Sequence, residues 1–386
     1  MRRFYTAESV TEGHPDKLCD QIADAVLDEC LKEDSESRVA CEVLATRGHL
    51  LVAGEITSKH EPYVPEIVKK ILEDTGYQAE DITIDVQIHK QSPDIARAVD
   101  HPQERRKGVS EEAEARGNGA GDQGVMIGYA CNETAQLMPM PVVLAHRIVR
   151  ELSACRRSEY IKGILPDGKA QVTVEYEDGK PIRVDNVIVS CQHAGDKSLR
   201  KLEQEIRNKV LLPALRPLPA DEDTKIYINP SGRFVCGGFD ADTGVTGRKL
   251  MVDSYGSIIP HGGGAFSGKD CSKVDRSGAY MARYIAKNLV AANLADRCQV
   301  SLAYAIGMAE PVMVQVETFG TGRVCADDCL AAAILLVFGL SPKQICDTFR
   351  LKRPIFQRTA VYGHFGRKEF PWERTDKTEE LRNAVM

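Results

Sequence analysis

The feature that most restricts the fold of this 386-residue chain is a pattern that recurs three times along it. Each occurrence is an amphipathic helix, two alternating strands and a second helix. The expected first helices are 15–30, 141–157 and 276–293, and the second helices are 65–74, 197–210 and 327–337. The expected strand pairs are 39–45 with 50–57, 170–176 with 186–192, and 299–306 with 312–318, and one further strand is expected at 82–89. We therefore predict an α+β fold of three similar modules related by a pseudo-threefold, with mixed sheets covered by helices on one face.

A long polar connection, 92–120, separates the first two units. It has few large apolar residues, many charges and a glycine-rich end at 117–124, which suits a lid that closes over a polar ligand. A plain linker is the alternative. We predict modules at 1–100, 119–238 and 239–386, with a gating loop at 101–118.

Composition excludes several classes of protein. A net charge of −6 argues against general nucleic-acid binding. The twelve cysteines form no C-x-x-C pair, and the closest two, Cys325 and Cys329, have no histidine beside them, which argues against a zinc site. The longest apolar run, 330–340, is about half a membrane span. With scattered thiols and no recognisable signal peptide, we expect a cytoplasmic protein with no nucleic-acid or membrane partner.

The stretch 261–277, HGGGAFSGKDCSKVDRS, has the composition of a polyphosphate site. Its glycines allow the backbone to approach a ligand closely, and Lys269 and Lys273 supply positive charge. Asp275 adds an oxygen ligand suited to Mg²⁺. The spacing also fits a P-loop, but Asp270 stands where that motif needs a Ser or Thr hydroxyl. A flexible surface turn is the alternative.

Other polar residues stand at positions that call for an explanation. His14 and Asp16 lie at the expected start of a helix, where amide donors favour anions, although such a pair is more often a structural cap. Glu42 and Glu55 are isolated carboxylates in apolar strands, which is costly unless they are paired or bind a cation. The segment 165–169, LPDGK, is expected to be a simple hairpin turn.

Two glycine-rich segments, 229–238 and 240–249, precede the polyphosphate stretch. They carry an aromatic residue, Phe234, a carboxylate, Asp242, and the adjacent cations Arg248 and Lys249. Adjacent cations after a glycine turn are commonly a solvated surface pair. The short distance in sequence to 261–277 favours a shared site instead.

Taken together, these segments resemble the S-adenosylmethionine synthetase (methionine adenosyltransferase) family. The resemblance covers residues 8 to about 376, and its two signature segments are GAGDQG at 119–124 and GGGAFSGKD at 262–270. Further matching blocks, in the same order, are ESVTEGHPDK, KQSPDI, TGRK, KVDRS and GHFGR. The resemblance implies three α+β domains and the formation of S-adenosylmethionine from ATP and L-methionine. The methionine sulfur attacks C5′ of ATP and displaces triphosphate, which is hydrolysed to pyrophosphate and phosphate.

The resemblance also implies roles for individual residues. The residues implied to be catalytic are His14, Lys169, Arg248 and Lys269. The implied ATP site comprises His14, Asp167, Lys169, Phe234, Asp242, Arg248, Lys249, Ala265 and Lys269. The implied methionine site comprises Glu55, Gln91, Asp122, Asp242 and Lys273. Asp16 and Asp275 are implied Mg²⁺ ligands, with two Mg²⁺ per site, and Glu42 is an implied K⁺ ligand. Active sites shared between two subunits imply a homodimer, and pairing of dimers implies a homotetramer.

The chain departs from the family pattern in one segment: 96–117 is longer and more charged than the usual gating loop. Two other functions remain open from the sequence. One is another ATP-using enzyme, such as a kinase or ligase, with a similar polyphosphate site. The other is a non-catalytic subunit that regulates an active relative.

Overall fold

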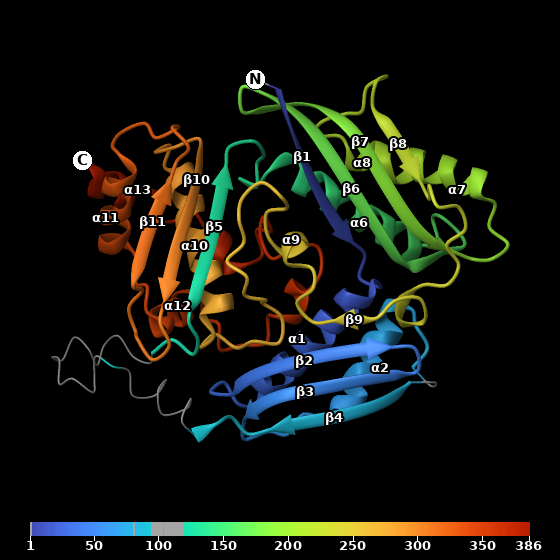
Figure 1. The fold of residues 1–386 in the computed structure, drawn as a ribbon, viewed down its shortest axis with the longest axis horizontal. Coiled ribbons are helices and arrows are strands. Elements are labelled where there is room, and N and C mark those ends of the chain that lie inside the picture. Colours follow the sequence, from blue (N-terminus) through green and yellow to red (C-terminus); the bar gives the residue numbers. More distant parts are fainter. Residues whose placement is uncertain (1, 80–81, 94–102, 104–118) are drawn as a thin grey trace.

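The computed structural model describes residues 2–79, 82–93, 103 and 119–386 (Figure 1). Apart from Gln103, the predicted gating loop at 101–118 lies outside the described residues, as does the departure at 96–117. The module boundaries expected at 100, 118 and 238 remain predictions.

Three sheets form the framework, and Figure 1 shows them arranged around a common centre. The strands are β1 (Arg2–Val10), β2 (Arg38–Thr46), β3 (His49–Thr57), β4 (Thr83–His89), β5 (Gly124–Cys131), β6 (Ile164–Glu177), β7 (Lys180–His193), β8 (Lys225–Ile228), β9 (Gly244–Val245), β10 (Arg297–Tyr304) and β11 (Met313–Glu317). The strand orders in the three sheets are β4-β3-β2-β9, β1-β6-β7-β8 and β11-β10-β5. Two sheets are mixed, because β4 pairs in parallel with β3 and β8 in parallel with β7; the described pairs of the third are antiparallel.

Each sheet is built on one of the predicted strand pairs and receives a strand from another part of the chain. The strand ahead of the first unit, β1, pairs with β6 of the second unit. In the same way β5 pairs with β10 of the third unit, and β9 pairs with β2 of the first. The exchange is therefore cyclic, and this topology is compatible with the predicted pseudo-threefold.

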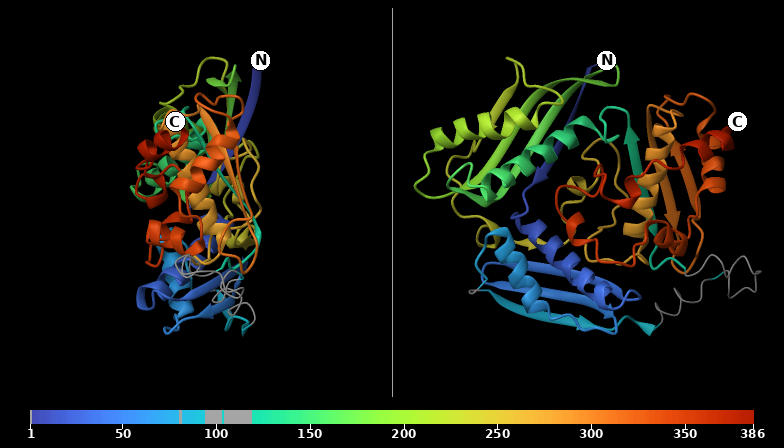
Figure 2. Two further views of the ribbon diagram at one scale, coloured as in Figure 1. Left: turned by 90° about the vertical axis from the view of Figure 1, so that its left-hand side faces the viewer. Right: turned by 180° about the vertical axis from the view of Figure 1, so that it is seen from behind.

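Helices cover one face of these sheets, as predicted. They are α1 (Pro15–Glu33), α2 (Val64–Thr75), α6 (Met140–Arg157), α7 (Leu199–Ile206), α8 (Leu212–Ala214), α9 (Leu250–Asp253), α10 (Val274–Ala291), α11 (Asp327–Val337), α12 (Pro342–Phe349) and α13 (Thr378–Val385). The first helix of each unit packs on its own sheet: α1 on β2, α6 on β1 and β6, and α10 on β5 and β10. The edge view in Figure 2 shows the helices gathered toward one side of the molecule and the strands toward the other.

The approach of α10 to its sheet depends on a residue without a side chain. A Cβ on Gly128 of β5 would lie 2.2 Å from the carbonyl oxygen of Ala282, so only glycine allows this contact. Almost the whole of α10 is buried. The apolar core has two parts. One lies between the β1-β6-β7-β8 sheet and the helices α6 and α7, and a larger one is shared by the other two sheets and their helices.

The prediction of a hairpin turn at 165–169 is wrong, since this segment lies within β6. Gly168 pairs with Cys191 of β7, after an irregularity in the register at Pro166 and Asp167. The turn that joins β6 to β7 is the second Asp-Gly pair of the region, Asp178-Gly179, whose φ angles of 48° and 80° suit a tight two-residue hairpin. Strands β1 and β5 were not expected from the sequence.

In the part of the chain that the structure describes, no single helix is long and apolar enough to cross a membrane, although the bent pair α11–α12 passes the same test of length and composition.

Candidate functional site

Residues from three distant segments meet at the start of α1, in what we call the first cluster: His14, Asp16, Lys169, Arg248 and Lys249. His14 caps α1, as predicted, because its Nδ1 accepts a hydrogen bond from the Asp16 N–H at 3.2 Å. Asp16 accepts from Lys249 Nζ at 2.6 Å and from the Val245 N–H at 3.0 Å, and Arg248 Nε lies 3.7 Å from it.

The electrostatics of the first cluster keep His14 neutral. Burial, followed by the positive charge of Lys249, lowers the pKa of His14 to about 4. Burial alone would raise the pKa of Asp16, but the hydrogen bonds from Lys249 and Val245 outweigh it and lower that pKa below its usual value. Because Nδ1 accepts a hydrogen bond, the proton of the neutral imidazole resides on Nε2.

The predicted nucleotide residues of the central module border this cluster. Lys169 on β6 pairs with Glu8 of β1 at 2.5 Å. Asp167 accepts from the Gly238 N–H at 3.0 Å, and burial raises the pKa of its carboxyl to about 6. Its own N–H donates to Gln192, whose side chain donates to the Val235 carbonyl. The adjacent Phe234 is held through its backbone, which exchanges hydrogen bonds with His193.

A second cluster, Lys269, Asp270, Lys273 and Asp275, comes from a single stretch of chain. Lys269 Nζ lies 2.6 Å from Asp275, and Lys273 Nζ lies 2.5 Å from Asp270. Burial alone would raise the pKa of Asp270, but Lys273 lowers it below its usual value. The loop passes close behind Asp275, since a Cβ on Gly264 would lie 2.2 Å from that carboxylate.

Two of the predicted glutamates lie near the second cluster, on the sheet face opposite α1. Glu42 follows the buried Cys41 on β2 and points away from the helix, where partial desolvation raises the pKa of its carboxyl and Lys269 partly offsets this. Glu55 on β3 stands across from Ala40 on the same face and acts electrostatically on Glu42.

Each of the remaining predicted residues lies near one of the two clusters. Gln91 lies past the end of β4, where its N–H donates to Thr57 at 3.4 Å, close to Glu55. Asp122 lies beside the second cluster, because the neighbouring Gly121 N–H donates to the Ser272 carbonyl at 3.1 Å. Asp242 belongs with the first cluster, as an electrostatic neighbour of His14.

Ala265 contacts the turn that precedes the two cations of the first cluster. A Cβ on Gly247 would lie 2.6 Å from the Cβ of Ala265. The two predicted segments 246–249 and 262–270 are therefore in contact within one chain.

Sequence reasoning missed the residues that hold both clusters in place. Four aspartates at intervals of four along α1 each accept hydrogen bonds from backbone N–H groups of a distant segment. The bonds run from Val245 to Asp16, from Gly247 to Asp20, from Gly268 to Asp24, and from Phe356 and Gln357 to Asp28, at 2.8–3.0 Å. The signal was legible in the sequence, because side chains four residues apart share one face of a helix.

A fully buried member of this row, Asp24, also binds Arg276. Both guanidinium nitrogens lie 2.7 Å from the carboxylate oxygens, and neither side chain is exposed. Arg276 Nη1 donates to the Lys269 carbonyl at 3.0 Å as well. Asp24 and Arg276 therefore fix the backbone of the second cluster.

The two clusters are separated along a common framework. Lys269 pairs with Ala40 of β2, whereas Gly244, which precedes the first cluster, pairs with Ala45. Five residues of strand correspond to about 16 Å. From Asp16 to Asp24, eight residues of helix correspond to about 12 Å. The two clusters are therefore two separate half-sites on one framework.

Among the described residues, no group of three or more His, Cys, Asp or Glu side chains forms a metal site on its own. Asp16 and Asp275 each offer carboxylate oxygens beside a lysine. This set suits Mg²⁺, which is held by one or two carboxylates while phosphate oxygens and water complete its coordination.

Comparisons with known proteins agree with the resemblance noted in the sequence. Three family models match successive parts of the chain: the S-adenosylmethionine synthetase N-terminal domain at 2–97, the central domain at 117–234 and the C-terminal domain at 236–374. A protein named S-adenosylmethionine synthase from Treponema denticola is 52% identical over 391 residues, covering 99% of this chain and 98% of that protein.

Proposed function

The chain belongs to the S-adenosylmethionine synthetase family, and from this premise we propose that its two clusters hold the two parts of one ATP and methionine site. The chain is a methionine adenosyltransferase, which forms S-adenosylmethionine from ATP and L-methionine. The observation that carries the assignment of the site is a repeated pair: a lysine lies 2.6 Å from an aspartate in each cluster, Lys249 with Asp16 and Lys269 with Asp275.

The chemistry asks for charge stabilisation rather than proton removal. A thioether sulfur is uncharged and needs no general base to attack C5′ of ATP. The enzyme must align the sulfur and stabilise the departing triphosphate. Lys169, Arg248, Lys249 and Lys269 supply the positive charge for this anion. In the structure these cations are partnered by carboxylates. When phosphate oxygens replace the carboxylates as partners of the cations, the carboxylates become available to bind metal ions.

His14 acts as a neutral donor. With a pKa of about 4 it carries no charge at neutral pH, and its Nε2–H points a hydrogen bond toward an oxygen of the departing triphosphate. Asp167, Phe234, Asp242 and Ala265 line the nucleotide part of the site. Burial keeps Asp167 close to half-protonated near pH 6, so it can accept or share a hydrogen bond with the base or ribose.

The family uses metal ions, and Asp16 and Asp275 are the residues that would hold Mg²⁺, one in each cluster. With both bound, each site would hold two Mg²⁺. Glu42 would hold K⁺ on the open face of β2, where Lys269 is close by. Bound Mg²⁺ neutralises charge on the triphosphate. The protein residues orient the chain of phosphates between the two clusters.

Methionine is placed on the side of the second cluster. Lys273 suits the carboxylate of the amino acid, and Glu55 and Asp122 suit its ammonium group. Gln91 and Asp242 complete the site. Glu55 lies on the open face of the sheet, so the methionine site faces away from the helices.

A second subunit is expected to complete each site. The sheet face without helices carries exposed apolar side chains: Leu44 follows Glu42 on β2, and Val125 and Met313 stand in one row across β5, β10 and β11. They are 36–42% exposed, and an apolar face of this kind favours association. In a homodimer formed through this face, the first cluster of one subunit meets the second cluster of its partner. Pairing of two dimers gives the homotetramer.

The test of the reaction is a product analysis. The full chain is incubated with ATP, methionine, Mg²⁺ and K⁺, and the products are identified by mass and by phosphate assay. We expect S-adenosylmethionine with equal amounts of pyrophosphate and phosphate. ADP or AMP would indicate a kinase or ligase, and the absence of any product would indicate a regulatory subunit.

Mixing two impaired variants tests the shared site. Lys249→Ala weakens only the first cluster and Lys269→Ala only the second. If each site joins clusters from two subunits, a mixed dimer contains one intact site, and activity rises well above that of either variant when the two proteins are unfolded and refolded together. Failure to regain activity, with mixed dimers demonstrated by a tag, would place the whole site within one chain.

A further inference from the structure

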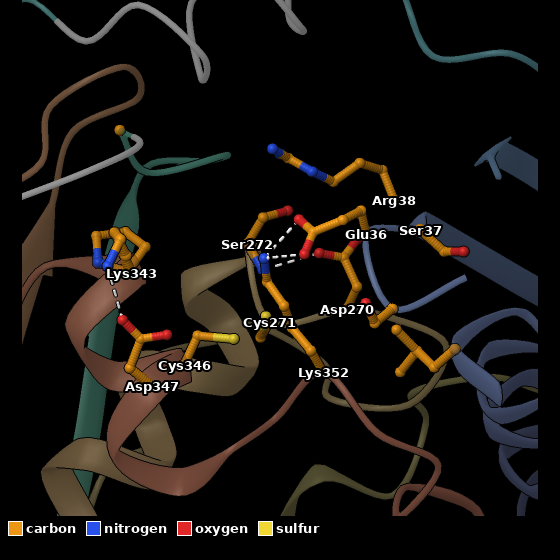
Figure 3. Close-up of a pocket in the computed structure, with 14 residues that line it drawn as sticks. Glu36, Ser37, Arg38, Asp270, Cys271, Ser272, Lys343, Cys346, Asp347 and Lys352 are labelled. Atoms are coloured by element: carbon orange, nitrogen blue, oxygen red, sulfur yellow. Dashed lines mark hydrogen bonds and ion pairs between the residues drawn. The ribbon is translucent and has the colours of Figure 1, made fainter. Parts of the chain in front are cut away.

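A cavity lies beneath the second cluster and shares Asp270 with it. It has a volume of about 250 Å³ and opens between the end of α1, the start of β2, the turn 270–272 and α12 (Figure 3). Its lining includes Arg38, Cys271, Ser272, Cys346 and Lys352. No described residue assigned above to ATP, methionine or a metal lines it.

The cavity brings two thiols together from distant parts of the chain. Cys271 and Cys346 both line the cavity. Cys346 is buried, whereas Cys271 is partly exposed. Figure 3 shows the Cys346 sulfur directed from α12 toward the turn that carries Cys271. Two thiols that line one cavity from neighbouring elements offer two ligands to one soft atom.

The state of the thiols decides which reagents suit the site. The neighbouring Cys346 side chain, together with burial, raises the pKa of the Cys271 thiol well above its usual value. Cys271 is therefore protonated at neutral pH, and reagents that need its thiolate, such as alkylating agents and disulfides, react slowly. A trivalent arsenical does not need a thiolate, because it condenses with two S–H groups.

We propose that Cys271 and Cys346 form a dithiol site for a soft, thiophilic centre such as a trivalent arsenical, and that occupation of this site impairs methionine binding. With an arylarsine oxide, both S–H bonds break, two As–S bonds form, and the oxygen leaves with the two protons as water. Arsenic stays trivalent throughout, so no oxidant or reductant is needed. The cavity is large enough for the aryl group, since a cavity of about 150 Å³ holds a benzene molecule.

The turn that carries Cys271 explains the effect on methionine, and this part rests on the proposed function. Asp270 accepts from the Val39 N–H at 2.7 Å and binds Lys273, the residue proposed for the methionine carboxylate. On the other side, Ser272 accepts from the Gly121 N–H at 3.1 Å, next to Asp122. A bridge from Cys271 to α12 and an aryl group in the cavity would fix this turn and displace Lys273.

A second pair of thiols in the chain serves as an internal control. Cys325 and Cys329 lie at the start of α11, where burial and the neighbouring Cys329 raise the pKa of Cys325 to about 11. They are partly exposed and lie away from the turn 270–272. An arsenical bound there should leave catalysis unchanged.

The experiment uses phenylarsine oxide and the full chain, with intact-mass measurement and an assay of S-adenosylmethionine formation. We expect the Cys325→Ala/Cys329→Ala variant to retain one phenylarsenic adduct, and the same variant with Cys346→Ala added to carry none. Treatment should lower kcat/KM for methionine about tenfold or more in the first variant and leave the second unchanged, since displacement of a positioning group costs up to about 10² in rate. A dithiol such as 2,3-dimercaptopropanol should restore activity.

Several outcomes would overturn the proposal, and they differ from failure of the proposed function. Retention of the adduct in both Cys346→Ala and Cys271→Ser would remove the site. An adduct at the site with unchanged kinetics would remove the coupling. Cys271→Ser serves as the second variant should Cys346→Ala fail to fold, as judged by circular dichroism. Inability of the untreated protein to make S-adenosylmethionine would contradict the proposed function alone, because the adduct is measured by mass.

Discussion

The two clusters carry the same kind of Lys–Asp pair but are assembled differently. The second cluster comes from residues 269–275, within seven positions of one another, so its side chains are close in any fold of that stretch. The first cluster joins the start of α1, β6 and the turn before α9, which meet only because β9 pairs with β2 and Asp16 and Asp20 bind the turn. One half of a site can thus come from residues that are close in sequence and the other half from residues joined by tertiary contacts, with both halves anchored to α1.

The largest expected effect concerns the helix that supports both halves. Asp24→Asn leaves Arg276 buried with an incomplete partner, and breaking a buried ion pair costs about 3–5 kcal/mol. Urea unfolding of the variant should show a loss of that size in the free energy of unfolding. Asp74→Asn, an exposed change on α2, is the matched control and should alter stability by less than about 0.5 kcal/mol. Equal stability of the two variants would mean that α1 does not anchor the second cluster.

The second prediction compares the two clusters by the positive charge that remains after one lysine has been removed from each. Lys269→Ala should reduce kcat by about 10² or more, because it removes a cation that stabilises the leaving triphosphate. Lys249→Ala should cost less, about tenfold, since Arg248 and Lys169 remain in the first cluster. Lys69→Ala on α2 is the control for an exposed lysine. A raised KM for methionine with unchanged kcat would instead assign Lys269 to methionine.

The smallest effect is a dependence of stability on pH in the first cluster. The pKa of His14 is about 4 in the folded chain and near 6.5 when unfolded, so the unfolded state binds more protons between these values. The stability that this group contributes is complete above pH 6.5 and is lost as the pH falls toward 4. At pH 5 the loss is about 2 kcal/mol.

Unfolding of the ligand-free wild type and of His14→Asn, measured between pH 8 and pH 5, isolates this contribution. Asparagine keeps a side chain that can cap α1. The other titrating groups are common to both proteins and cancel in the difference. A difference in unfolding free energy that does not change with pH would show that His14 is not held in its neutral form.

The sequence allowed accurate prediction wherever the signal was local. The helix start at His14 and Pro15, the three strand pairs and the loop 261–277 all follow from spacing, capping and glycine content. The failures share a cause. Strands β1 and β5 have no partner nearby in the chain, and the choice between the two Asp-Gly pairs near 168 and 179 depends on pairing with β7.

The same limit applied to the site. Individual residues of the first cluster were assigned only through the resemblance to a known family, because nothing local joins Asp16 to Lys249. The aspartates at 20 and 24 were overlooked although their spacing is regular. A row of carboxylates on a buried helix face is costly unless each one has a partner. The regular spacing of these aspartates could therefore have predicted that they bind other segments of the chain.

The cyclic exchange of strands bears on how the chain is made. Strand β1 pairs with residues 169–177, and β2 gains its last neighbour only when residues 244–245 have been synthesised. Contacts of such long range slow folding. Each sheet therefore waits for another part of the chain during translation: the sheet of β6 and β7 is complete after residue 228, that of β2 and β3 after residue 245, and that of β5 and β10 after residue 317.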